Sequence, residues 1–389
     1  MALTGDKIGV PEAEEAPAVV MPRWKQPIAG VIGLIVTFVI TLIAWYIVAL
    51  GGGAAFLSLI GGFGLMGVLF AIWFENWPFS TKFDKPWKVG IAATILNIIV
   101  IVIMVFVAIW FSGVYGTMLG ITDPLTAYWV GASIFGALSA SCFSFAVLWV
   151  AGTMYWPWFD KKQPGRGIRV FIVGWIITLI AWALLFFPHG NPAATALNPA
   201  SWVRPMYGIN MAWTQWTIFF SLLTLMTFEY WPWDKLGSQP KIGIVAFVVC
   251  TILGYVWIYV AGIVGFVVTN PLFQLLGFVA PADVTAAVGL WNVAYADWLI
   301  VAVIAVALFL DNWPKGYSQK VNLLIRLVTV VILGTLFFIL SYYFSPILGT
   351  AFLGSPYYDN LTAFLVFLLW VELVFAYLWR KWPVYTTLE

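Results

Sequence analysis

The chain has 389 residues, of which 63% are hydrophobic and only 9% are charged. A soluble domain carries about 25% charged residues, so this composition excludes an ordinary soluble protein. The formal net charge of +2 gives no indication of nucleic-acid binding. We therefore expect an integral membrane protein, placed in the cell (inner or plasma) membrane.

Ten apolar runs follow one another along the chain. A helix that crosses the roughly 30 Å hydrocarbon core needs about 20 apolar residues. The runs cover 28–50, 54–74, 89–112, 127–151, 168–187, 211–229, 242–268, 292–310, 323–344 and 361–380. The sequence predicts an all-α polytopic membrane protein with ten transmembrane helices in a single domain over 28–384. Residues 1–27 and 385–389 are expected to be tails, the first of them mobile.

Basic residues indicate the orientation, because Lys and Arg stay on the cytoplasmic side during insertion. Alternating the ten runs across the membrane puts every Lys and Arg except Arg204 on the side of both termini. The predicted topology is multi-pass, with both termini cytoplasmic.

A Trp-Pro pair follows every second run, in the contexts "FENWPFS", "MYWPWFD", "FEYWPWD", "FLDNWPK" and "LWRKWPV". The tryptophans are Trp77, Trp156, Trp231, Trp313 and Trp382. Trp favours the membrane interface, and Pro disfavours helical geometry in the residue before it. We therefore predict interfacial anchors that end five tandem helical hairpins of the same orientation, over 28–78, 89–157, 168–232, 242–314 and 323–383.

Three of these pairs have an acid two positions before the Trp, namely Glu75, Glu229 and Asp311. A carboxylate at a helix C-terminus opposes the helix dipole. The acids are therefore expected to have basic partners nearby.

Few ionisable or strongly polar residues lie deep within the apolar runs, where such groups are costly and mark candidate functional sites. Asp297 and Gln215 each stand sixteen residues before a repeat tryptophan, and Glu372 stands ten before Trp382. Arg326 lies in the same hairpin as Glu372, so the two are a candidate buried pair. The alternative is an Arg that reaches the interface and an unrelated protonated Glu.

The even-numbered runs also carry hydroxyl groups and small residues. Such residues permit close helix packing, and they are equally candidates for lining a narrow polar path. The hydroxyl residues in question are Ser139, Ser141, Ser144, Thr214, Thr217, Ser221 and Thr224.

No phosphate-binding loop, Cys-x-x-Cys pair, cluster of metal-ligand spacing or nucleophile elbow is present in the sequence. We therefore expect no metal, no cofactor and no enzymatic activity. Expected partners are membrane lipids. The loops 113–126, 188–210, 269–291 and 345–360 are a candidate docking surface for a partner subunit, and a homo-oligomer is compatible with them.

Two functions agree with this pattern. The first is transport, as a channel or secondary transporter whose even-numbered helices line a path for a small solute or ion. The alternative is a non-transporting membrane subunit or scaffold that binds lipid, quinone or a partner enzyme. Ten helices in five same-way hairpins are similar in layout to the tellurite-resistance and plant slow-anion-channel family, where a central pore is expected. That likeness rests on helix count, since none of the family's motifs occurs here.

Overall fold

A computed structural model describes residues 20–50, 57–118, 120–186, 199–264, 267, 270–275, 291–344 and 360–387. Each of the ten apolar runs is helical within these ranges, as predicted. Two short strands, a 3-10 turn η6 (Trp233–Leu236) and the short helices α3 (Phe79–Lys82) and α10 (Asn270–Leu275) complete the described structure.

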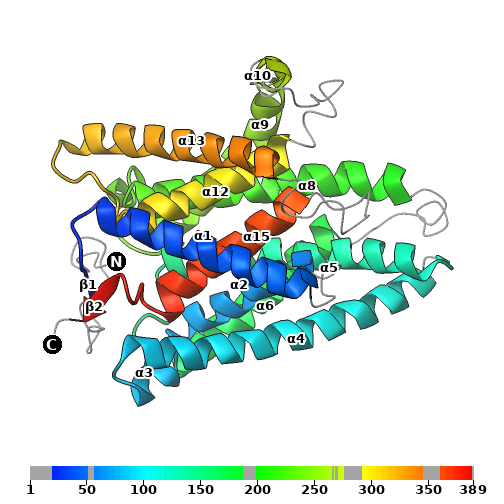
Figure 1. Ribbon diagram of the computed structural model, residues 1–389, viewed down its shortest axis with the longest axis horizontal. Coiled ribbons are helices and arrows are strands. Elements are labelled where there is room, and N and C mark those ends of the chain that lie inside the picture. Colours follow the sequence, from blue (N-terminus) through cyan, green and yellow to red (C-terminus); the bar gives the residue numbers. More distant parts are fainter. Residues whose placement is uncertain are drawn as a thin grey trace.

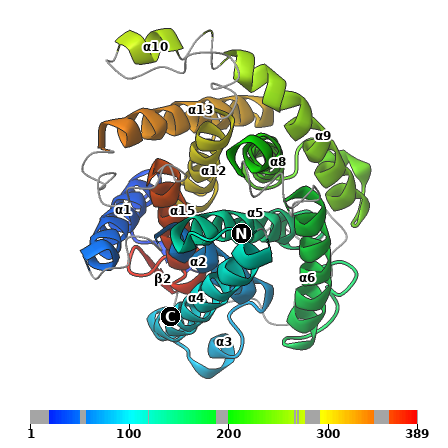
Figure 2. The ribbon, with the colours of Figure 1, turned by 90° about the vertical axis from the view of Figure 1, so that its right-hand side faces the viewer.

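Five long helices form the outer layer of the molecule (Figure 2). They are α1 (Ile28–Val48), α4 (Pro86–Met118), α6 (Gly165–Leu185), α9 (Lys241–Val264) and α13 (Gln319–Phe344). All five are long and apolar enough to cross a membrane. Their outward faces carry large exposed apolar side chains, such as Phe106 and Trp110 of α4, each 67% exposed. An apolar surface of this extent is what an all-α membrane-embedded protein presents to lipid.

Five further helices form an inner ring, and each ends just before a Trp-Pro pair. They are α2 (Leu57–Trp73), α5 (Pro124–Ala146) with η4 (Val147–Gly152), α8 (Pro199–Leu222) with η5 (Leu223–Thr227), α12 (Ala296–Ile304) between η8 (Trp291–Tyr295) and η9 (Ala305–Phe309), and α15 (Asn360–Leu373) with η10 (Val374–Leu378). Helices hydrophobic all round belong in an interior, and every residue of α12 is buried.

The inner helices contact one another in chain order, and the last of them closes the ring on the first. Contacts run from α2 to α5, α5 to α8, α8 to α12, α12 to α15 and α15 back to α2. Figures 1 and 2 show the long outer helices packed around this core. The axis of the ring is therefore surrounded by side chains from all five repeats.

Strands β1 (Val20–Pro22) and β2 (Tyr385–Thr387) form an antiparallel pair that joins the two predicted tails. Val20 pairs with Thr387, and Pro22 pairs with Tyr385. The expectation of a mobile tail is therefore wrong for residues 20–27. Their backbone and side-chain bonds to the C-terminal segment and to Asp311 hold them in place.

Candidate functional site

The five Trp-Pro pairs adopt one backbone conformation, which we call the Trp-Pro corner. In every corner the two residues before Trp have positive φ, between 48° and 72°, and the Trp-Pro peptide is cis. None of these positive-φ residues is glycine. A left-handed conformation costs an ordinary residue about 1–2 kcal/mol, so surrounding contacts must hold the corners in place.

Four of the five inner helices widen into a π-helical turn immediately before the corner. In these turns an amide bonds five residues back, as from Phe228 to Leu223 at 2.8 Å and from Leu310 to Ala305 at 3.0 Å. The first repeat makes its five-residue bond two positions later, from Asn76 to Ala71 at 2.8 Å. Carbonyl oxygens at such a helix end are left to accept bonds from other partners.

A closed belt of side-chain bonds links the corners around the ring. The donor is the residue directly before Trp, and in four joints the acceptor is the carbonyl five residues before the Trp of the preceding repeat. The joints are Asn76 Nδ2 to Tyr377 O (3.0 Å), Tyr155 OH to Ile72 O (3.0 Å), Tyr230 OH to Ala151 O, and Asn312 Nδ2 to Met226 O (3.0 Å). The fifth joint is an ion pair, with Lys381 Nζ 2.7 Å from Asp311 Oδ1.

The outer helices dock on the same corners, and each belongs to the repeat two places further around the ring. Gln163 Nε2 donates to Trp73 O (3.2 Å), Gln239 Nε2 to Gly152 O (2.7 Å), Arg326 Nη1 to Thr227 O (3.0 Å), and Gln26 Nε2 to Phe309 O (2.9 Å). Each acceptor lies four residues before its Trp. In the fifth corner, Trp379 Nε1 instead donates to Thr94 Oγ1 of α4 at 3.0 Å.

Glycine permits the close approach that docking requires. A Cβ atom on Gly243 would lie 2.5 Å from the carbonyl carbon of Gly152, and one on Gly30 would lie 2.6 Å from Phe309 O. The amides of Gly30 and Gly243 donate to Gln26 Oε1 and Gln239 Oε1. Each glutamine thus caps its own helix and holds a neighbouring corner.

All three corner acids have basic partners, which confirms that expectation. Glu75 lies 2.5 Å from Arg166, Glu229 lies 3.3 Å from Arg326, and Asp311 pairs with Lys381. The candidate pair of Arg326 with Glu372 is wrong. The Arg326 side chain is instead engaged at a corner, by Glu229 and by the carbonyls of Thr227 and Pro314.

The pair of Asp311 and Lys381 belongs to a cluster that also holds the chain ends. The Gln26 amide donates to Asp311 at 2.7 Å, and the Tyr385 hydroxyl donates to the same carboxylate. Burial by itself would raise the pKa of Asp311, but the Lys381 ammonium and these hydrogen bonds hold that pKa below its usual range. Asp311 is therefore a carboxylate whose charge stabilises the folded ring.

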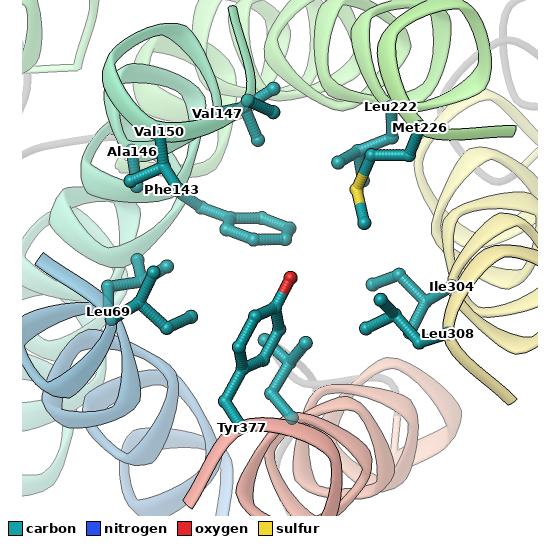
Figure 3. A pocket seen from close by; sticks show the side chains of 13 residues that line it. Leu69, Phe143, Ala146, Val147, Val150, Leu222, Met226, Ile304, Leu308 and Tyr377 are labelled. Atoms are coloured by element: carbon teal, nitrogen blue, oxygen red, sulfur yellow. The ribbon is translucent and has the colours of Figure 1, made fainter. Parts of the chain in front are cut away.

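A partly open cavity of about 50 Å³ lies on the ring axis, lined by the inner helices just before the corners (Figure 3). All five inner helices contribute to its wall. The lining residues are Leu69, Ile72, Phe143, Ala146, Val147, Val150, Ala151, Leu222, Met226, Ile304, Leu308, Leu373 and Tyr377. Figure 3 shows the Phe143 ring and the Tyr377 hydroxyl reaching toward the middle of this space.

None of the residues predicted to line a path is part of this wall. Asp297 and Glu372 are buried, 3% and 1% exposed. Within the described part of the chain, Asp297 Oδ2 and Glu372 Oε2 have no hydrogen-bond partner. Gln215 is half-buried, with its Nε2 3.8 Å from Met211 Sδ. Asp297, Gln215 and Glu372 therefore do not line the cavity, and no hydrogen bond joins any two of them.

The predicted hydroxyl residues bond within their own helices, face a glycine of a neighbouring helix, or are buried. Thr214, Thr224 and Ser144 donate to carbonyls four residues earlier in their own helices. Thr217 faces α9, because a Cβ added to Gly254 would lie 2.8 Å from Thr217 Oγ1. Ser139 faces α2, because a Cβ added to Gly62 would lie 3.1 Å from Ser139 Oγ. Ser141 and Ser221 are buried, 3% and 1% exposed. Close packing explains these contacts.

The corner tryptophans lie on the surface or at its edge. Trp77 and Trp313 are 38% and 44% exposed, and Trp156, Trp231 and Trp382 are half-buried.

No protein-family model, curated protein or solved structure matches this chain. The layout similarity to the slow-anion-channel family therefore gains no support from these comparisons. In the described ranges, no group of three or more His, Cys, Asp or Glu side chains could hold a metal ion.

Sequence reasoning missed three features of this site. The motif Gln-Pro-x-x-Gly occurs as "QPIAG", "QPGRG" and "QPKIG", and each copy begins an outer helix that docks on a corner. A search for short motifs repeated before the apolar runs would have found it. Phe143 and Tyr377 carry no such signal, because an aromatic residue in an apolar helix resembles any other core residue.

Proposed function

We propose that the chain crosses its membrane ten times, as five same-way hairpins with the corners and both termini on the cytoplasmic side. Five long outer helices with apolar outward faces support this, together with Lys and Arg residues concentrated near the corners. The bonds that join all five corners into one belt support a common side for them.

On this basis we propose transport of a small solute along the ring axis, as a channel or secondary transporter. The observation that carries the proposal is the axial cavity, since residues from all five inner helices surround it. The Phe143 ring extends from α5 into the cavity, so we propose that it is the side chain that closes the axial path (Figure 3). Apolar constrictions close pores by excluding water.

A non-transporting membrane subunit is the second candidate. The cavity is small, and none of the predicted polar residues lines it, which favours a structural role. In that case the belt and the docking bonds would serve to present a rigid surface to a partner protein. Of the loops expected to dock such a partner, residues 276–290 and 345–359 lie outside the described residues, whereas 113–118 and 199–210 are helical, in α4 and α8.

Flux through reconstituted vesicles separates the two candidates. Phe143→Ala should raise uptake of a small solute above that of vesicles with the wild-type protein. Phe106→Ala is the matched control, because Phe106 lies on the outward face of α4 and is 67% exposed. Equal, background uptake for all three proteins would exclude axial transport and favour the structural role.

A further inference from the structure

The axial cavity carries no charge and almost no polarity. Twelve of its thirteen lining side chains are apolar, and the remaining one is Tyr377. Figure 3 shows the Tyr377 hydroxyl directed into the cavity. This hydroxyl is the one polar side-chain group in the cavity wall, so it is placed to bond to a molecule that enters.

Four backbone carbonyls at this level are already engaged, which leaves no complete ring of free carbonyls to replace the water around an ion. The carbonyls of the cavity residues Ile72, Ala151, Met226 and Tyr377 already accept the belt bonds. Potassium-type pores depend on rings of free carbonyls for this purpose. Here the same atoms hold the corners together.

Side-chain charges near the corners are also committed elsewhere. Glu229 pairs with Arg326, Asp311 pairs with Lys381, and none of the four lines the cavity. An ion on the axis would lose its hydration shell without any compensating charge or dipole. That loss is strongly unfavourable, whereas an uncharged molecule loses far less.

We propose that the axial path admits small uncharged molecules and excludes ions, with the Tyr377 hydroxyl as the group that hydrogen-bonds the passing molecule. This inference rests on the proposed axial transport and names its substrate class. The cavity volume of about 50 Å³ limits the size of that molecule. A water molecule needs roughly 10–15 Å³ on this measure, so the space holds about three to five non-hydrogen atoms.

Urea, guanidinium and nitrate test the proposal, because they are planar molecules of equal heavy-atom count that differ in charge. Uptake of each labelled compound is measured in vesicles with the full-length protein, with K⁺ and valinomycin present to prevent charge build-up. Vesicles with Phe143→Ala should take up urea about tenfold faster than protein-free vesicles, and guanidinium and nitrate at the protein-free rate. Adding Tyr377→Phe to Phe143→Ala should lower urea uptake several-fold. Phe143→Leu provides the same comparison if the alanine variant does not fold.

Two results would overturn the inference in distinguishable ways. Guanidinium or nitrate uptake as fast as that of urea would leave the axial path standing and refute its restriction to uncharged molecules. Uptake of all three at the protein-free rate, in folded Phe143→Ala and Phe143→Leu, would refute the path itself.

Discussion

Asn312 offers the sharpest test of the belt, because it combines a buried bond with a strained backbone. Its side chain is 5% exposed, its φ is +55°, and its Nδ2 donates to Met226 O at 3.0 Å. Asn tolerates left-handed geometry better than other non-glycine residues. Asn312→Ala removes this bond, together with a longer one to Glu229 Oε1 (3.4 Å), and places alanine at positive φ.

The expected loss is the sum of these two effects. A buried hydrogen bond contributes about 1 kcal/mol net, and forcing alanine into the left-handed region costs about 1–2 kcal/mol. Asn312→Ala should therefore lower the free energy of unfolding by about 2–3 kcal/mol. Asn312→Gly removes the bond but adopts positive φ freely, so its loss should be about 1 kcal/mol.

Equilibrium unfolding of the purified protein in mixed micelles, followed by tryptophan fluorescence, measures these differences. Asn76 is a second test of the same joint, since it has φ +60°, is 9% exposed and donates to Tyr377 O at 3.0 Å. The stability order should be wild type, then glycine, then alanine at both positions. Alanine variants as stable as the wild type would refute the belt as a source of stability.

Three further predictions concern docking, pH and topology. Gln239→Ala loses the bond to Gly152 O and the cap on its own helix, so it should lower the free energy of unfolding by about 1–2 kcal/mol. An unchanged free energy of unfolding would argue against docking through this glutamine. The lowered pKa of Asp311 stabilises the fold at pH above its ordinary value of 3.8, and that contribution is lost as pH falls through the lowered value. Thermal unfolding at decreasing pH should therefore show a steeper loss for wild type than for Asp311→Asn, and parallel curves would contradict the role of the pair with Lys381. A single-cysteine variant, Lys235→Cys next to the third corner, should react with an impermeant thiol reagent added to inverted vesicles but not to right-side-out vesicles. Labelling in right-side-out vesicles would contradict the proposed orientation.

The helices were predictable from the sequence because their signal is local. Runs of about 20 apolar residues and Trp-Pro ends need no knowledge of neighbours, and each run is helical in the structure. The basic partners of Glu75, Glu229 and Asp311 also followed from a local argument, the helix dipole. Which base pairs with which acid did not follow, since Arg326 reaches a corner two repeats away.

The ring and its cavity depend on relations between repeats that local patterns do not contain. Polar residues inside apolar runs attracted attention because they are costly there, yet the hydroxyls of Thr214 and Thr224 are satisfied within their own helices. The axial wall includes ordinary apolar residues at equal distances before each corner, such as Ile72, Met226 and Leu308. Only the closed packing of the helices distinguishes them from the rest of the core.

The central claim is that an axial path runs through the five-helix ring. Chemical modification of a cysteine placed at Leu308 tests this claim most directly. Leu308→Cys, in a Phe143→Ala protein with Cys142 and Cys250 replaced by alanine, places one thiol on the cavity wall. Complete modification by a methanethiosulfonate reagent, verified by mass spectrometry, should abolish urea uptake. The same modification at Ile332→Cys, on the outward face of α13 and 59% exposed in the native protein, should leave uptake unchanged. Undiminished urea uptake after full modification at Leu308→Cys would contradict the account.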